Sequence, residues 1–267
     1  NPEVFSGLYV FGDSLSDYGS RAAEFQRYLF APDASPAWSG VTFSNSQSNW
    51  QTLLSETLGL QPGSLTNQKN LPADPYYLYA NELVSPSSLA KETTGGTSYA
   101  MGGATSGYTT LYQFSEPILA KKLQIENLGV AAQISAALGE QSVRLNSSDF
   151  AVVWAGGNDL LVAFGAQKSL SDTLDQLVAQ LRNDLETVLR FGDARHAMLT
   201  AISPLSGVVN AIKYQAPFLS GLILAASSPT APEFLKEWVN EYNEGIVDLF
   251  RVDIEAMVAE VQKAFPY

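Results

Sequence analysis

The stretch Tyr9-Val10-Phe11-Gly12-Asp13-Ser14-Leu15-Ser16-Asp17 decides the predicted fold of this chain. It begins within a short apolar segment, residues 7–12, which has the composition of a buried β-strand. Polar, glycine-containing sequence follows directly, so Ser14 stands just beyond the carboxyl end of this strand. Open α/β sheets carry their ligand sites at that end of their strands. The stretch therefore predicts an α/β sheet with the Ser14 hydroxyl at a site of chemistry.

Strand-like and helix-like segments alternate along the rest of the chain. Predicted strands cover residues 7–12, 97–103, 149–155 and 197–202, and predicted helices cover 50–60, 123–138, 170–190 and 233–264, the last with an alternative strand at 246–252. Gly192 is predicted to end the helix over 170–190. Because no repeat or composition shift divides the chain, the sequence predicts one doubly wound domain over residues 1–267. The loops at 31–49 and 61–95 are expected to set specificity.

The composition limits the class of protein. The 267 residues are 46% hydrophobic, and no apolar run approaches the roughly 20 residues of a membrane-spanning helix. The net charge of −12 argues against a nucleic-acid partner, because binding phosphates requires a surface rich in Lys and Arg. The chain has no Cys, which excludes disulfides and thiol catalysis. It begins with Asn1, which we interpret as processing of a secreted or periplasmic protein, although a boundary chosen for expression would look the same.

Three glycine-containing loops follow predicted strands, namely Gly12-Asp13-Ser14, Gly102-Gly103-Ala104 and Gly156-Gly157-Asn158-Asp159. In a parallel sheet these loops converge on one edge. Acyl transfer needs a nucleophile there, together with hydrogen-bond donors for the developing oxyanion. Ser14 offers a hydroxyl, Gly103 a backbone N–H with no side chain in the way, and Asn158 a side-chain amide.

Each loop taken alone has an ordinary structural explanation. Ser14 has the residue type of a helix N-cap, the glycine pair that of a tight turn, and Asn158 that of an Asx turn. Asp13, Asp17 and Asp159 suggest a Mg²⁺ site, but no further carboxylates show ligand spacing. The combination of the three loops, each after a predicted strand, is what favours chemistry.

The loops resemble the sequence blocks of the GDSL, or SGNH, family of ester hydrolases, and the resemblance covers most of the chain. Phe11-Gly12-Asp13-Ser14-Leu15-Ser16-Asp17 is similar to the first block, Ser98-Tyr99-Ala100-Met101-Gly102-Gly103-Ala104-Thr105 to the second, and Gly156-Gly157-Asn158-Asp159 to the third. Gly192-Asp193-Ala194-Arg195-His196 resembles a fourth, non-catalytic stretch. The most similar branch contains bacterial secreted lipases, phospholipases, acyltransferases and choline-type esterases.

The resemblance implies a three-layer α/β/α, flavodoxin-like SGNH-hydrolase fold with a central parallel sheet. It implies that Ser14 is the nucleophile and that its own N–H, Gly103 and Asn158 form the oxyanion hole, with Gly102 as the one-residue alternative to Gly103. The expected reaction is hydrolysis of a small-molecule or lipid carboxylic ester through an acyl-enzyme. No metal or organic cofactor is expected.

The resemblance also implies a general base, a histidine in an Asp-x-x-His motif. The chain has one histidine, and Asp193-Ala194-Arg195-His196 spells that motif. However, His196 precedes or begins the strand predicted at 197–202, so it is expected at the amino edge of the sheet, about 20 Å from the carboxyl edge. A base must come within about 3 Å of the hydroxyl that it activates. We therefore predict a structural role for His196.

The catalytic His and its Asp partner are accordingly expected outside residues 1–267, on a further segment or on a second polypeptide. Two other functions stay open. One is a non-catalytic, ligand-binding pseudo-esterase, in which Trp38, Tyr76, Tyr77 and Tyr79 form an aromatic wall for a cation. The other is a carbohydrate acetylesterase on the same scaffold.

Overall fold

The computed structural model describes residues 5–17, 50–60, 66–67, 97–115, 117–123, 126–140, 144–200, 233–243 and 246–266. The predicted specificity loop at 31–49 and nearly all of the loop at 61–95 lie outside these ranges, as do Trp38, Tyr76, Tyr77 and Tyr79. All three glycine-containing loops of the predicted site lie inside them.

The described strands form one parallel sheet of five strands, in the order β2-β3-β1-β4-β5. They are β1 (Gly7–Gly12), β2 (Thr66–Asn67), β3 (Thr97–Ser98), β4 (Asp149–Trp154) and β5 (His196–Thr200). β1 lies in the middle and pairs with β4 along its whole length, from Gly7 opposite Asp149 to Gly12 opposite Trp154. The loops after β1, β3 and β4 therefore leave the sheet at one carboxyl edge, as predicted.

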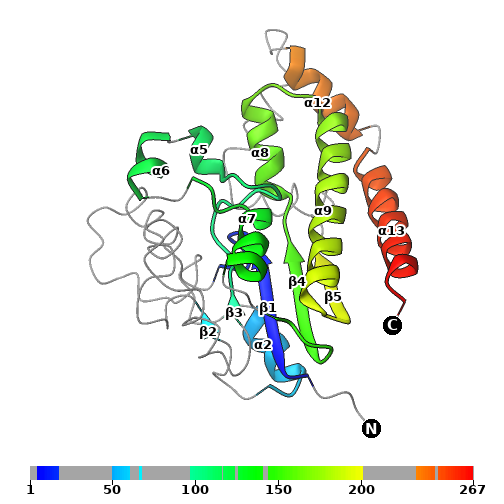
Figure 1. Cartoon of the computed structure of the whole chain (residues 1–267). Coiled ribbons are helices and arrows are strands. Elements are labelled where there is room, and N and C mark those ends of the chain that lie inside the picture. Colours follow the sequence, from blue (N-terminus) through cyan, green and yellow to red (C-terminus); the bar gives the residue numbers. More distant parts are fainter. Residues whose placement is uncertain are drawn as a thin grey trace.

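Helices pack on both faces of this sheet (Figure 1). The described helices are α2 (Trp50–Thr57), α5 (Leu111–Ser115), α6 (Pro117–Leu123), α7 (Val130–Ser135), α8 (Gly157–Gly165), α9 (Leu170–Gly192), α12 (Glu233–Asn243) and α13 (Ile246–Ala264), with a π-helical turn at Ala136–Glu140 after α7.

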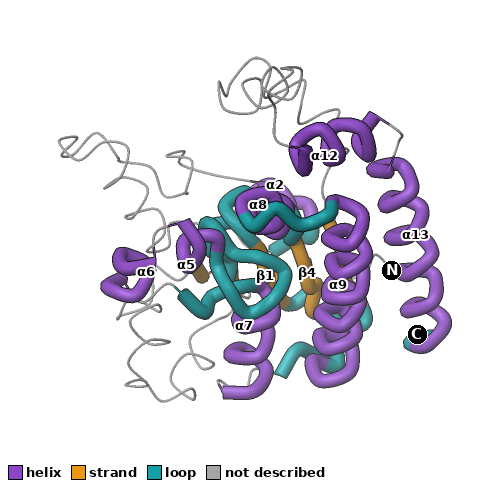
Figure 2. Tube along the Cα trace, turned by 90° about the horizontal axis from the view of Figure 1, so that it is seen from above, coloured by secondary structure: helices purple, strands orange, loops and turns teal. Residues whose placement is uncertain are grey.

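Alternate side chains of a strand point to opposite faces of its sheet, and β1 follows this rule. Tyr9 and Phe11 pack into the larger core with residues of α7, α9 and α13, whereas Leu8 and Val10 pack with residues of α2. Viewed from above in Figure 2, α13 lies outside α9 on the same side of the sheet. The layers are thus α2, the sheet, and α7 with α9, and the predicted three-layer α/β/α fold is confirmed.

Strand β1 and helix α9 match the predicted elements closely. The Ser169 hydroxyl caps the start of α9 by accepting a hydrogen bond from the Asp172 N–H at 3.2 Å, a common way to satisfy the first turn. The predicted end of this helix needs a small correction. Gly192 is its last residue, and Asp193 is the residue that takes the left-handed conformation, with φ of 57°.

Two other predicted elements are wrong. The single helix predicted over 123–138 is divided, because α6 ends at Leu123 and α7 begins only at Val130. The division comes from contacts with another loop: Gly129 is extended (φ −66°, ψ 170°), and its N–H donates to the Tyr108 oxygen at 3.1 Å rather than to a carbonyl one helical turn earlier. The alternative strand at 246–252 is also wrong, since those residues belong to α13.

The strand predicted over 97–103 is shorter than expected, because β3 covers only Thr97–Ser98. The Tyr99 and Met101 N–H groups nevertheless donate to the Val10 and Gly12 carbonyls at 2.7 and 2.9 Å. The extended pairing with β1 thus continues up to the turn that begins at Met101.

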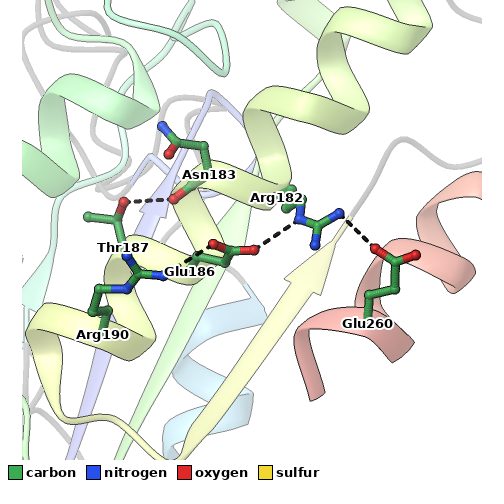
Figure 3. A network of polar contacts seen from close by, with 6 residues as sticks. All are labelled: Arg182, Asn183, Glu186, Thr187, Arg190 and Glu260. Carbon is green, nitrogen blue, oxygen red and sulfur yellow. Dashed lines mark hydrogen bonds and ion pairs between the residues drawn. The ribbon is translucent and has the colours of Figure 1, made fainter. Parts of the chain in front are cut away.

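Helices α9 and α13 are joined by a polar network on the surface and by apolar side chains beneath it. The Arg182 guanidinium donates to Glu186 at 2.9 Å and to Glu260 of α13 at 2.8 Å (Figure 3). Exposed ion pairs of this kind stabilise a protein only weakly. The buried side chains Met257 and Val261 of α13 lie in the main core and supply the larger part of the attachment.

Candidate active site

Ser14 lies two residues beyond β1 and is half-buried. Asp13, which precedes it, is buried and shapes the turn: its Oδ1 accepts the Leu15 N–H at 3.0 Å, and its backbone oxygen accepts the Ser16 N–H at 3.0 Å. A side chain that bonds the N–H two residues on forms an Asx turn. Asp13, rather than Ser14, is thus the capping residue of this turn.

Helix α2 holds the turn from its other side. The Trp50 Nε1–H donates to the Leu15 oxygen at 3.2 Å, and the Gln51 side-chain amide donates to the Ser16 oxygen. The Trp50 ring also lies 5.4 Å from the ring of Trp154, the last residue of β4. The segment after Ser14 is therefore held by α2, which itself packs against the end of β4.

Gln133 of α7 completes the end of β1. It is buried, its Oε1 accepts the Gly12 N–H at 2.9 Å, and its Nε2 donates to the Gly12 oxygen at 2.9 Å. The side-chain amide pairs with Gly12 as a neighbouring strand would. It does so where the Met101–Ala104 turn carries the chain away from β1. Sequence reasoning missed this residue, although a Gln among the apolar residues of α7 was a signal for it.

The second loop is a tight turn over Met101–Ala104. The Ala104 N–H donates to the Met101 oxygen at 3.1 Å, and Gly103, the third residue, has φ of +82°. A positive φ at this position is the mark of a type II turn, which favours Gly there. The N–H of Gly103 belongs to the central peptide of such a turn and takes no part in its closing hydrogen bond.

Gly102 and Gly103 differ in what their N–H groups do. The Gly102 N–H donates to Oδ2 of the buried Asp17 at 2.7 Å. This hydrogen bond occupies the N–H of Gly102, the residue that was the alternative to Gly103 as the second oxyanion donor. It therefore favours Gly103 over Gly102 for that role, which stays a prediction.

The third loop leads into α8 and is bonded to the second. The Asn158 Nδ2 donates to the Ala104 oxygen at 2.8 Å. The neighbouring Asp159 carboxylate accepts hydrogen bonds from the Ser106 N–H at 2.9 Å and from the Ser106 hydroxyl at 2.6 Å. Asn158 is buried at the first turn of α8, where the helix dipole favours negative charge.

Three carboxylates lie beneath the loops. Burial raises the pKa of Asp13 to about 7, the Leu15 N–H opposes this, and the charges of Asp159 and Asp17 raise the pKa further. Burial also raises the pKa of Asp159, against the lowering effect of its bonds to Ser106. Within the described ranges, no group of three or more His, Asp or Glu side chains is arranged to hold a metal ion.

His196 lies at the opposite edge of the sheet from Ser14. In the sheet, His196 of β5 pairs with Phe150 of β4, which pairs with Leu8 near the start of β1. Ser14, in contrast, follows Gly12 at the end of β1. Four residues of strand separate the two levels by about 13 Å, far beyond the reach of a general base. The His196 ring packs against Phe5 at 5.1 Å. The predicted position of His196, at the amino edge of the sheet, is confirmed.

The carboxyl edge thus brings together Ser14, the Gly103 turn and Asn158, joined by the hydrogen bonds from Met101 to Gly12 and from Asn158 to Ala104. A hydroxyl, a backbone N–H and a side-chain amide on linked loops are the kinds of group that acyl transfer uses. No helix in the described part of the chain is long and apolar enough to span a membrane.

Comparison with known proteins places this site in a family. A search of curated proteins finds no match for this chain. A family model for GDSL-like lipases and acylhydrolases matches residues 8–264, which include all three loops. The chain therefore belongs to the GDSL-like lipase/acylhydrolase family.

Proposed function

We propose that this protein is a serine-dependent carboxylic ester hydrolase with Ser14 as its nucleophile. The observation that carries the proposal is the linkage of the three loops at the carboxyl edge, from Gly12 to Met101 and from Ala104 to Asn158. Membership of the acylhydrolase family supports the same reaction class.

In the proposed reaction, the Ser14 Oγ attacks the ester carbonyl carbon and a general base takes the hydroxyl proton. The carbonyl oxygen becomes an oxyanion, which accepts hydrogen bonds from the N–H groups of Ser14 and Gly103 and from the Asn158 Nδ2. Collapse breaks the bond to the alcohol, which leaves with a proton, and water then hydrolyses the acyl-enzyme. The Asn158 Nδ2 has two hydrogens, so its bond to Ala104 leaves one for the oxyanion.

The general base is proposed to be a histidine outside residues 1–267, on a further segment or a second polypeptide. The position of His196 at the opposite edge of the sheet supports this proposal. Secretion also stays a prediction from the sequence.

The proposed substrates are esters with apolar acyl groups. Exposed apolar side chains occur on the elements around the site: Leu15 follows Ser14, Phe114 lies on α5, and Ile118 lies on α6. The Leu111 N–H at the start of α5 donates to the Gly103 oxygen at 2.7 Å. We propose that these three side chains contact the acyl group, since exposed apolar patches often mark ligand or lipid contact.

A second candidate function is binding of an ester ligand without turnover. It is favoured by one observation, the distance of the only histidine from Ser14. Without a base, the hydroxyl keeps its ordinary reactivity, and only the residual effect of the oxyanion donors remains.

Treatment with a fluorophosphonate, followed by intact mass measurement under denaturing conditions, separates the two functions. The esterase is expected to gain one adduct, on Ser14, and to hydrolyse p-nitrophenyl esters. The Ser14→Ala variant is expected to lose both the adduct and the turnover. An unlabelled wild-type protein with no ester hydrolysis, in a preparation whose mass shows a further segment or a second polypeptide beside residues 1–267, would reject the esterase and favour the binding protein.

A further inference from the structure

We propose that Asp17 is a positioning residue for the oxyanion hole, which acts by fixing the turn that presents the Gly103 N–H. The proposal rests on the proposed acyl-transfer function of the same site. Asp17 is almost completely buried, with 1% of its surface exposed, and its Oδ2 accepts the Gly102 N–H at 2.7 Å. A bond of this length between an N–H and a carboxylate is among the stronger hydrogen bonds in proteins.

Two consecutive glycines make the turn easy to deform without such a bond. Gly populates positive and negative φ almost equally, and rotation of the peptide between Gly102 and Gly103 converts a type II turn into a type I turn. That rotation would turn the Gly103 N–H to the opposite side. The orientation of the second donor therefore depends on whatever holds Gly102.

Two other hydrogen bonds fix the flanks of the turn. The Met101 N–H is bonded to Gly12, and the Gly103 oxygen accepts the Leu111 N–H. Asp17 supplies a third hydrogen bond, at Gly102, between these two. It thus anchors Gly102, and rotation of the central peptide changes the ψ angle of that residue.

The buried carboxylate of Asp17 lies close to other acidic groups, which is unfavourable for the stability of the folded protein. Its carboxylate adds to the rise in pKa of both Asp13 and Tyr112, so it lies within electrostatic reach of the turn and of the Tyr112 ring that packs on Gly103. A buried carboxylate near other acids is unfavourable unless its hydrogen bonds compensate. An Asn in this position would keep an oxygen acceptor without the charge.

The test compares Asp17→Ala with Asp17→Asn in steady-state hydrolysis of p-nitrophenyl butyrate. Loss of one oxyanion donor lowers kcat by about 10²–10³ in a serine hydrolase. We expect Asp17→Ala to lower kcat by about 10–100-fold, with KM changed by less than about 3-fold. Asp17→Asn is expected to recover most of the lost kcat, because its side-chain oxygen still accepts the Gly102 N–H.

Asp149 provides a matched control. It is also a buried carboxylate that accepts a backbone N–H, from Asn146 at 2.8 Å, but it begins β4 at the other edge of the sheet. Asp149→Ala is expected to lower the melting temperature and leave kcat of the folded protein unchanged. Amide hydrogen exchange provides a readout that does not depend on turnover: the Gly102 N–H should lose protection in Asp17→Ala and regain it in Asp17→Asn.

The outcomes separate this proposal from the one on which it rests. If the wild-type protein shows no turnover that depends on Ser14, the esterase function is rejected, and the positioning role of Asp17 is rejected with it. Turnover through Ser14 that survives in folded Asp17→Ala with unchanged kcat would overturn the role of Asp17 alone. The same conclusion would follow if Asp149→Ala lowered kcat as much as Asp17→Ala.

Discussion

Gly103 and the Tyr112 ring are packed so closely that a β-carbon on Gly103 would lie 2.5 Å from the Tyr112 Cε2. Gly103 also has φ of +82°, a conformation that residues with a side chain rarely adopt. The glycine is thus required twice, by the backbone conformation of the turn and by the space that Tyr112 occupies.

Gly103→Ala is therefore expected to reduce ester hydrolysis by at least about 100-fold, since the turn must change its conformation and move the N–H donor. The measurement is kcat for p-nitrophenyl butyrate, with circular dichroism to confirm the fold. Gly165→Ala is the matched control, because a β-carbon there meets no atom within 4 Å. Equal activity of the two variants would contradict the assignment of Gly103 as a donor.

Gln133 is expected to be important for stability as well as for the position of Ser14. Gln133→Leu has a similar volume but leaves the Gly12 N–H without the bond to Oε1 and removes the bonds to Gly12 and Leu128. A buried group left without its partner costs about 1–3 kcal/mol, so we expect a loss of about 2–3 kcal/mol in the free energy of unfolding. Urea denaturation measures it. Gln176→Leu, at an exposed position of α9, should change the stability by less than about 0.5 kcal/mol.

The local pattern of the sequence was sufficient to predict β1, β4 and α9, because each has an uninterrupted apolar run or stripe bounded by polar or glycine residues. It was not sufficient at 123–138, where the apolar periodicity continues past Gly129. Only the hydrogen bond from the Gly129 N–H to the Tyr108 oxygen shows that the chain before Val130 is held by another loop and not by a helix. That contact depends on the tertiary fold.

The same limit applies to the site. The loops were predicted from their glycines and from their positions after strands, whereas the bonds that hold them join residues far apart in the chain. Asn158 lies 54 residues from Ala104, Asp17 lies 85 residues from Gly102, and Gln133 lies 121 residues from Gly12. Pairings over such separations leave no periodic signal, so the supporting residues could only be found from the fold.

Phe114 and Ile118 are predicted to contact the acyl chain of the substrate. They are 56% and 87% exposed on the two helices that follow the Gly103 turn. Burying a CH₂ group contributes about 0.8 kcal/mol, so we expect Phe114→Ser and Ile118→Ser to raise KM for p-nitrophenyl octanoate by about 3–10-fold and leave acetate hydrolysis unchanged. Phe191→Ser, an exposed apolar position at the end of α9, is the control. A uniform effect on both esters would contradict a role in acyl-chain binding.

Asp184 is an acid in the core that the proposed reaction does not use. It is buried on α9, its Oδ1 accepts the Gln180 Nε2–H at 2.8 Å, and its Oδ2 has no hydrogen-bond partner among the described residues. Burial raises its pKa from 3.8 to about 7, the bond from Gln180 opposes this, and the charge of Asp159 adds to the rise. The folded protein therefore holds this proton at pH values where the unfolded chain has released it.

The sign of the pH dependence follows from that difference. The stabilising contribution of the protonated carboxyl is fully present below the unfolded-state pKa, falls as the pH rises, and is lost once the pH passes the folded-state pKa of about 7. Between pH 5 and pH 8 we expect this group to reduce the free energy of unfolding by an amount on the order of 2 kcal/mol. Asp13 should contribute in the same direction.

Asp184→Asn removes the titrating group and is expected to make the decline in stability between pH 5 and pH 8 shallower by that amount. Urea midpoints at the two pH values measure it. Asp175→Asn, an exposed position on the same helix, should leave the wild-type slope unchanged. If Asp184→Asn kept the full slope, the Asp184 carboxyl would be ionised in the folded protein across this range. The pH dependence would then have to come from Asp13 and the other carboxylates beneath the loops.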